Sequence, residues 1–133
     1  MQNKLHRIID VNLNRSREAL RVCEDIARFV LNDKALTGSL KNTRHKISKI
    51  QIGNVAEARS VKTDIGKKSS FDKGKPKNLT LLFYNNIHRA EESTRSLEEF
   101  SKLTTPDLSA KFKSLRFAIY SIEKKAMKKL KSL

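Results

Sequence analysis

The sequence has no tryptophan, a single cysteine, four glycines and two prolines in 133 residues. One cysteine cannot form a disulfide within the chain or a cysteine-rich metal site, which favours a reducing cytoplasmic location. The scarcity of glycine and proline disfavours a turn-rich β fold. No apolar stretch is long enough to cross a bilayer, and none resembles a signal peptide. We therefore expect one soluble, cytoplasmic, largely helical domain.

Positive charge is in clear excess. The chain carries 29 Lys and Arg against 14 Asp and Glu, a formal net charge of +15. Such a chain attracts polyanions, which can be nucleic acids, an anionic membrane surface or small phosphorylated compounds. Aromatic residues make up only 6% of the chain, and no nucleic-acid reader motif is present, which disfavours nucleic acid.

Apolar residues recur at spacings of three and four in four segments, 3–31, 33–51, 78–103 and 105–131, which predicts four helices. Thr105 followed by Pro106 is typical of a helix N-terminus. Short connections after the first and third segments predict antiparallel hairpins, 3–51 and 78–131. The linker between them, 52–77, is rich in Lys, Ser, Asp and Gly and poor in large apolar residues, so it cannot form core.

The two hairpins resemble each other. With an offset of 74 residues, the first and third helices share five polar positions: Asn12 and Asn86, Arg15 and Arg89, Glu18 and Glu92, Arg21 and Arg95, Glu24 and Glu98. This pattern indicates an internal duplication. The predicted fold is an all-α, antiparallel four-helix bundle in a single domain, with a pseudo-two-fold axis relating its hairpins.

Two of these polar residues fall among the apolar positions of the first helix. Asn12 and Arg15 lie on the arc that carries most apolar side chains, whereas Glu18 and Arg21 are expected on the opposite face. A buried arginine needs a carboxylate or a bound anion. One interpretation places the arginine heads in solvent at a helix seam. The other is a cavity lined by arginines and amides, for which small neighbours such as Ser16 leave room.

The remaining candidates for chemistry have simple interpretations. Cys23 lies within the apolar pattern and is expected to be a buried thiol. The three histidines, His6, His45 and His88, have no spacing typical of a zinc site, which favours solvated or packing roles. Surface ion pairs three or four residues apart account for the charged residues that follow in the repeat, Arg21, Glu24, Arg95 and Glu98.

Three stretches together carry a family resemblance: IIDVNLNRSREALRVCEDIARFVL at 8–31, ARSVKTDIG at 58–66 and NNIHRAEESTRSLEEFSKL at 85–103. They resemble the small hydroxymethylpyrimidine phosphate kinase family of thiamin biosynthesis, which is unrelated to the ribokinase-like enzyme and is often fused to thiamin-phosphate synthase. The resemblance implies ATP-dependent phosphorylation of 4-amino-5-hydroxymethyl-2-methylpyrimidine monophosphate to the diphosphate, with Mg²⁺, by a standalone form of the family. It also implies that the free alcohol is not accepted.

The resemblance also assigns roles to residues. Arg15, Arg89 and Arg59 are implied to act on the transferring phosphoryl group, and Asp64 is a candidate Mg²⁺ ligand. The implied substrate- and nucleotide-binding residues are Asn12, Glu18, Asn86, Glu92, Arg44, Arg116 and Gly66. Thr94 and Ser60 depart from the family pattern. The duplication suggests two half-sites, one for the nucleotide and one for the phosphorylated pyrimidine, without indicating which is which.

Two other classes of protein stay open at this point. A basic nucleic-acid-binding protein is supported by the net charge and by the lysine-rich C-terminus KKAMKKLKSL. A scaffold without activity needs no arginines on an apolar arc. The sequence does not define the oligomeric state, and a homo-oligomer is compatible with it.

Overall fold

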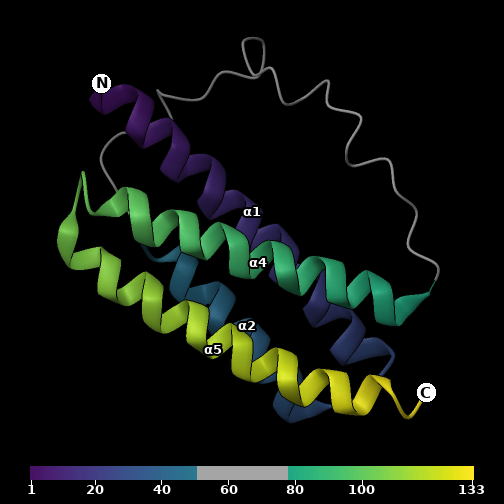
Figure 1. Ribbon diagram of the computed structural model, residues 1–133. Helices are drawn as coiled ribbons and strands as arrows, with labels where there is room; N and C mark the ends of the chain where they lie inside the picture. Colours follow the sequence, from purple (N-terminus) through teal and green to yellow (C-terminus); the bar gives the residue numbers. More distant parts are fainter. Residues whose placement is uncertain (51–77) are drawn as a thin grey trace.

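The computed structural model describes residues 1–50 and 78–133. Within these ranges the chain forms four helices and no strand: α1 (Gln2–Phe29), α2 (Lys34–Ser48), α4 (Leu79–Ser101) and α5 (Pro106–Leu130) (Figure 1). The predicted all-α fold is confirmed, with helix ends that lie within a few residues of the predicted ones. The predicted linker lies outside the described residues.

Helices that are neighbours in the bundle run antiparallel (Figure 1). α1 packs closely against both α2 and α4, and α4 packs against α5, whereas α2 and α5 make the fewest contacts of the four neighbouring pairs. The two hairpins are therefore joined mainly by α1 and α4, the helices that carry the repeated polar motif. None of the described helices has the length and apolar character needed to cross a membrane.

The turn between α1 and α2 is specified by two polar residues. Asn32 adopts a positive φ of 51°, a conformation that asparagine tolerates better than most residues. Asp33 is the N-cap of α2, and its carboxylate accepts a hydrogen bond from the Leu36 amide at 2.9 Å. The same carboxylate forms an ion pair with Lys129 near the end of α5. This residue thus ties the start of α2 to the last helix.

The second hairpin begins and turns with similar local chemistry. Asn78 caps α4 by accepting a hydrogen bond from the Leu81 amide at 2.9 Å. Thr105 and Pro106 occupy the predicted N-cap and first helical positions of α5, but the Thr105 side chain makes no capping hydrogen bond. Asp107 places a negative charge in the first turn of α5, where the helix dipole favours it.

The core is formed by the predicted apolar stripes. The fully buried positions include Phe83 and Phe112, and Cys23 is buried as expected. Burial raises the pKa of the Cys23 thiol, and the nearby Glu91 carboxylate adds to this effect, so the thiol stays protonated. Val30 continues the apolar spacing of the first predicted helix but is 38% exposed, because α1 ends at Phe29.

Each hairpin contains one buried ion pair between its two helices. In the first hairpin, Arg44 Nε on α2 lies 3.0 Å from Glu24 Oε1 on α1. In the second, Arg116 Nη2 on α5 lies 3.0 Å from Glu98 Oε2 on α4. Glu24 and Glu98 were expected at the surface, but their side chains are only 6% and 7% exposed. Glu98 does form the expected pair at helical spacing, with Oε2 3.6 Å from Arg95 Nη1. The exposed pairs are formed instead by arginines of the same repeat, Arg21 with Asp25 and Arg95 with Glu99.

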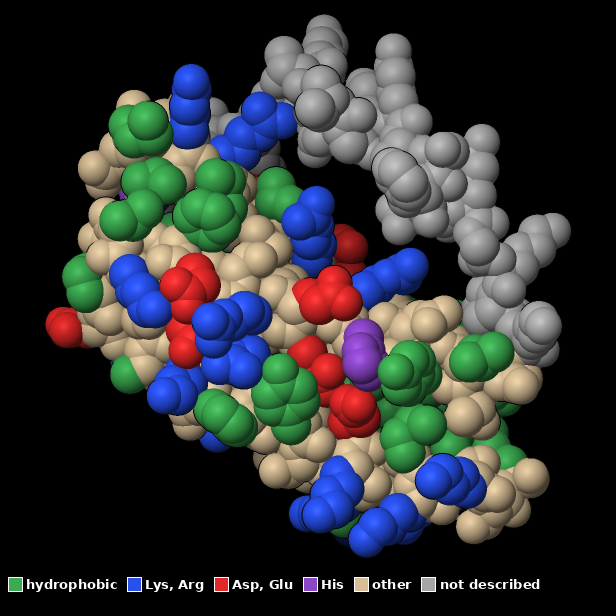
Figure 2. Space-filling view, viewed as in Figure 1, with side chains coloured by type: hydrophobic (Ala, Val, Ile, Leu, Met, Phe, Trp, Pro, Cys, Tyr) green, Lys and Arg blue, Asp and Glu red, His purple; other side chains and the backbone are tan. Residues whose placement is uncertain are grey.

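Lysine and arginine side chains are spread over the face formed by α4 and α5, as Figure 2 shows, while the acidic side chains gather near its centre. The net charge of the chain is therefore not confined to one patch on this face.

Candidate functional site

The helices α1 and α4 approach closely at a point where both carry small residues. The Ser16 hydroxyl lies 2.6 Å from the Ser93 hydroxyl, and both side chains are buried. Ala19 and Ala90 are buried near the same crossing. Small side chains bring the two backbones together here and leave space beside the crossing that larger residues would fill.

A cavity of about 670 Å³ opens between α1 and α4. This volume lies within the range typical of small-molecule sites. The residues that line it are Asn12, Arg15, Glu18, Ala19, Val22, Asn86, Arg89, Glu92, Ser93 and Ser96. They form five pairs, and the members of each pair are 74 residues apart, which is the offset of the internal duplication. The cavity is therefore built twice from the same sequence motif, once by each helix.

Two asparagines lie at the inner side of this cavity. Asn12 and Asn86 are only 6% and 7% exposed. Each side-chain amide donates a hydrogen bond at 2.9 Å to a backbone carbonyl one turn earlier, that of Ile8 or Leu82. Each amide retains a second N–H and its carbonyl oxygen for another partner. The same geometry thus appears in both halves of the cavity.

The arginines of the motif lie further out. Arg15 and Arg89 line the cavity but are exposed, so the expectation that they fall within the buried arc is wrong. The helix geometry explains this, because each step of three residues turns the side chain by about 60° around the helix axis. The asparagine faces the core, and the arginine three residues later reaches the edge of the buried arc. Within the described residues, Arg15 forms no ion pair.

The glutamates of the motif lie three positions after the arginines. Glu18 and Glu92 are exposed, but they also line the cavity, which corrects the expectation that Glu18 lies on the opposite face of its helix. The charged groups that line the cavity are two guanidinium groups and two carboxylates, so their formal charges cancel. Guanidinium groups are suited to phosphate oxygens, and carboxylate and amide oxygens are ligands that Mg²⁺ prefers.

Two other predicted site residues, Arg44 and Arg116, do not line this cavity. Arg44 and Arg116 are held by the buried glutamates of their hairpins. Tyr120 also accepts a hydrogen bond from Arg116 at 3.3 Å. Hydrogen bonding to Tyr120 and Glu98 raises the pKa of Arg116. Three predicted residues, Arg59, Asp64 and Gly66, lie outside the described residues.

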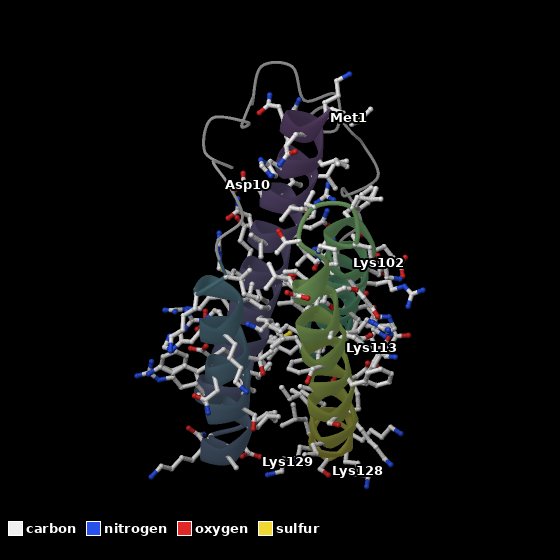
Figure 3. All side chains as sticks on the ribbon, turned by 90° about the vertical axis from the view of Figure 1, so that its left-hand side faces the viewer. Met1, Asp10, Lys102, Lys113, Lys128 and Lys129 are labelled. Atoms are coloured by element: carbon white, nitrogen blue, oxygen red, sulfur yellow. The ribbon has the colours of Figure 1, made fainter. Side chains whose placement is uncertain are left out.

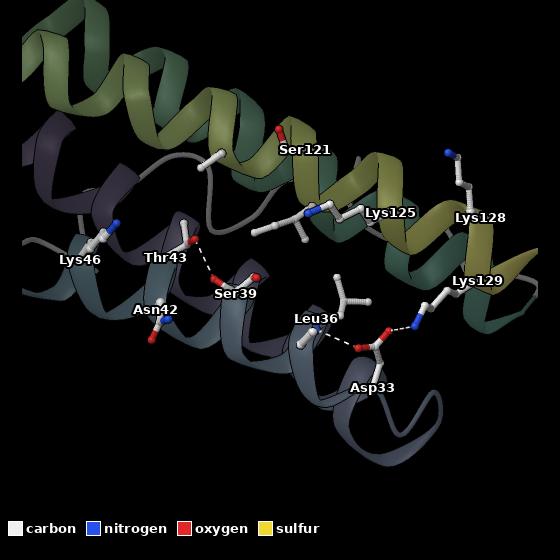
Figure 4. A pocket seen from close by; sticks show the side chains of 13 residues that line it. Asp33, Leu36, Ser39, Asn42, Thr43, Lys46, Ser121, Lys125, Lys128 and Lys129 are labelled. Atoms are coloured by element: carbon white, nitrogen blue, oxygen red, sulfur yellow. Dashed lines mark hydrogen bonds and ion pairs between the residues drawn. The ribbon is translucent and has the colours of Figure 1, made fainter.

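A second cavity, of about 600 Å³, lies between α2 and α5 (Figure 4). Its lining includes Lys46, Lys125, Lys128 and Lys129, and Asp33 is the one acidic residue among the lining side chains. Figure 3 shows Lys128 and Lys129 at the same end of the bundle. Asp33 neutralises Lys129 through its ion pair. The remaining lysines make this cavity cationic, but it lacks the duplicated arrangement of the first one.

The chain belongs to the ThiD2 family, whose model matches residues 7–125. It is similar to proteins named thiamine-phosphate synthase from Nostoc punctiforme (32% identical over 128 residues), Thermosynechococcus vestitus (35% over 121) and Prochlorococcus marinus (37% over 117). These matches cover 96%, 90% and 87% of this chain but only 36%, 34% and 34% of the relatives. The chain thus spans about a third of each of these relatives. No solved structure matches it.

Proposed function

We propose that this chain acts in thiamin biosynthesis as a kinase that converts 4-amino-5-hydroxymethyl-2-methylpyrimidine monophosphate to the diphosphate. Membership of the ThiD2 family and the names of the relatives support the pathway. The observation that carries the proposal is the duplicated cavity, in which two copies of an Asn, Arg and Glu set line one space. Two related half-sites suit a reaction that joins two phosphorylated molecules.

The charge problem of this reaction explains the arginines. A phosphate oxygen of the acceptor attacks the γ-phosphorus of ATP, the bond to the bridging oxygen breaks, and ADP leaves with the electron pair. Two unit charges about 4 Å apart repel each other by a few kcal/mol at a protein surface. Arg15 and Arg89, on opposite sides of the cavity, can each bind phosphate oxygens through two parallel N–H groups. They thereby hold both reactants and stabilise charge on the transferring group.

Little covalent chemistry is required of the protein. The attacking phosphate is already anionic, so the reaction needs no strong general base. Positioning of the two phosphates in line supplies most of the acceleration. Asn12 and Asn86 can recognise the edge of the aminopyrimidine or adenine ring with their free N–H and carbonyl groups. Their buried position and their bonds to the backbone keep these groups in place.

The lining side chains also fit a magnesium ion. Glu18 and Glu92 offer carboxylate oxygens beside the arginines, and such hard oxygen ligands suit Mg²⁺. Bound together with ATP, Mg²⁺ neutralises part of the charge on the donor phosphates. The carboxylates of Glu18 and Glu92 cancel the formal charge of the two arginines, so by themselves they do not attract a nucleotide. We therefore expect them to contribute to nucleotide binding through the cation. Asp64, which lies outside the described residues, stays a candidate ligand.

A direct assay tests the proposal. Purified protein is supplied with Mg-ATP and the pyrimidine monophosphate, ADP is measured by a coupled reaction, and the diphosphate product is identified by mass spectrometry. We expect turnover with the monophosphate and none with the free alcohol, which lacks the attacking phosphate. Absence of turnover with the monophosphate, in protein that circular dichroism shows to be helical, would reject the kinase.

The second cavity favours one other function. The lysines that line it, together with the net charge of +15, are suited to a nucleic-acid backbone. In that case the chain binds arbitrary single or double strands, and the logarithm of its affinity falls linearly with the logarithm of salt concentration. Substitution of Lys46 and Lys125 by Ala would reduce this slope. The kinase predicts instead that both variants retain full turnover.

A further inference from the structure

A second group of functional side chains lies on the face formed by α4 and α5, where acidic side chains gather beside a histidine (Figure 2). His88 and Glu91 are three residues apart on α4, and Glu123 is on α5. One ligand atom from each of them lies within 4.8 Å of the others. The His88 Nε2 atom is 3.2 Å from Glu123 Oε1, and His88 Nδ1 is 4.0 Å from Glu91 Oε1. None of the three lines the cavity between α1 and α4.

Two atoms of this cluster lack the hydrogen bonds that their burial demands. Glu91 is only 6% exposed, and its Oε2 atom is buried without a hydrogen-bond partner. The same is true of His88 Nε2, whose contact with Glu123 does not have hydrogen-bond geometry. Polar atoms buried in this way are rare in folded proteins and call for an explanation, such as an ion.

The two carboxyl groups cannot both be ionised and unneutralised at this distance. Their ligand atoms lie within 4.8 Å of each other, so two carboxylates there would repel each other. A cation or a shared proton between the two carboxyl groups would relieve this repulsion. A cation satisfies the unpartnered histidine nitrogen as well, which a shared proton between the carboxylates does not.

The cluster is not a by-product of the internal duplication. With the offset of 74 residues, His88 and Glu91 correspond to Asn14 and Arg17 on α1. There the Arg17 guanidinium donates a hydrogen bond to the Asn14 side chain, so the first hairpin carries its own positive charge at the equivalent position. The second hairpin instead concentrates acidic groups and an imidazole, and it has no arginine at this place.

We propose that His88, Glu91 and Glu123 bind one divalent transition-metal ion of the Zn²⁺ type, which links α4 to α5. An imidazole nitrogen with two carboxylates suits Zn²⁺, Co²⁺ or Mn²⁺, whereas Mg²⁺ prefers oxygen ligands alone. At tetrahedral angles, ligands about 2.0 to 2.2 Å from one ion are about 3.3 to 3.6 Å apart. The three ligand atoms, which lie within 4.8 Å of one another, therefore have to move closer together when an ion binds. Three protein ligands leave a position for water.

The neighbourhood supports such a site in two ways. The ring of Tyr84, one turn before His88, lies 4.1 Å from the imidazole between centroids, which restricts the orientation of the histidine. Arg89 and Glu92, each adjacent to one proposed ligand, line the cavity of the first site. An ion that fixes α4 against α5 therefore also fixes the helix that forms one wall of that cavity.

Metal titration tests this site. Protein treated with a chelator and then dialysed is titrated with Zn²⁺ by calorimetry and, in parallel, with Mg²⁺. We expect one Zn²⁺ per chain and a higher Tm with Zn²⁺, but no comparable binding of Mg²⁺. Substitution of a ligand, His88→Gln or Glu123→Gln, should weaken Zn²⁺ binding more than about 100-fold, beyond the usual cost of losing an outer-shell partner. The matched controls His45→Gln and Glu99→Gln, at exposed positions, should bind Zn²⁺ as the unchanged protein does.

A second measurement is made on protein in which all three proposed ligands are unchanged. The chain has three histidines, so their imidazole proton signals can be assigned in NMR spectra with His6→Gln and His45→Gln. Substoichiometric Co²⁺ should broaden the His88 signals before those of the other two. Equal broadening of all three histidines, equal Zn²⁺ affinity in His88→Gln, or no stoichiometric uptake by the helical wild-type protein would each overturn the proposal.

Discussion

The hydroxyl groups of Ser16 on α1 and Ser93 on α4 meet at 2.6 Å where the two helices cross. With the offset of the duplication, the corresponding residues are Ala90 and Ala19, so each helix contributes one serine and one alanine to the crossing. Ser93 also donates to the Arg89 carbonyl at 2.7 Å. At this crossing, small side chains let the two helices come close, and a hydrogen bond between the serines links the two hairpins.

A larger side chain at this crossing should lower the free energy of unfolding more than loss of the hydrogen bond does. Ser16→Ala is expected to cost about 0.5 to 1 kcal/mol of the free energy of unfolding, because Ser93 retains its backbone partner. Ser16→Leu should cost about 1 to 3 kcal/mol, because the larger side chain separates the helices. Urea unfolding measures both variants. If Ser16→Leu were as stable as Ser16→Ala, close approach of α1 and α4 would not be required.

The buried ion pair between Glu98 and Arg116 gives a second prediction. Glu98→Ala removes one partner and leaves a guanidinium group that is 11% exposed, which should cost about 3 kcal/mol of the free energy of unfolding. Arg95→Ala on the same helix breaks only pairs of an arginine that is 57% exposed and should cost less than about 1 kcal/mol. Chemical denaturation of the two variants side by side checks the difference. Equal losses would show that burial of the pair contributes nothing to stability.

The helices could be predicted because their apolar periods and caps are local. Phe83, Phe112 and Ile119 are buried as predicted, since a stripe at spacings of three and four has only one side to bury. The pairing of helices followed from short connections within each hairpin. The duplicated motif likewise indicated that Asn12 and Asn86 belong to equivalent places, and the cavity confirms this geometry.

The ion pairs and the histidine cluster that join different helices could not be predicted, because they depend on distances between helices. Glu24 and Glu98 have neighbours at helical spacing that can account for their charge, and Glu98 does pair with Arg95. Their closer partners, Arg44 and Arg116, lie on the other helix of each hairpin. The three histidines have no metal-site spacing among themselves, whereas His88 lies near Glu91 on its own helix and Glu123 on the next one. The three-residue spacing of His88 and Glu91 was visible in the sequence. The register of α5 against α4 was not.

The cap of α2 predicts a pH dependence of stability. The hydrogen bond from the Leu36 amide and then the pairing with Lys129 lower the pKa of Asp33 from its ordinary value of 3.8. A carboxyl group with a lowered pKa stabilises the fold above its ordinary pKa, and the contribution is lost as the pH falls through the lowered value. Asp33→Asn keeps a capping side chain but loses the charge. It should therefore be less stable than wild type near pH 7, by no more than about 1 kcal/mol because Lys129 is exposed, and equal to it near pH 2.

A companion variant separates the cap from the charge. Asp33→Ala also loses the hydrogen bond to the α2 backbone and should cost about 1 kcal/mol more than Asp33→Asn. This additional cost should be present at both pH values. Thermal unfolding across the acidic range measures all three proteins, and a constant difference between wild type and Asp33→Asn would contradict the role of the ion pair.

The kinase predicts large rate effects from the cavity arginines. Arg15→Ala and Arg89→Ala should each lower kcat/KM for the pyrimidine monophosphate by more than about 100-fold, because each removes a group that stabilises transferring charge. Lys113→Ala, which removes an exposed positive charge on α5, serves as the control and should leave the rate unchanged. An equal loss in the control variant would attribute the effect to the general field of the protein.

The two half-sites predict that these arginines act on different substrates. In one of the two variants the KM for ATP should rise, with little change in the KM for the monophosphate, and in the other the pattern should be reversed. The physical reason is the duplication, which places Arg15 on α1 and Arg89 on α4 at the same cavity, so that each guanidinium group is expected to meet one ligand first. Steady-state kinetics with each substrate varied in turn measures both constants. Parallel increases of both KM values in both variants would mean that the arginines bind a single ligand together, and the two-half-site arrangement would then be wrong even if the kinase activity is present.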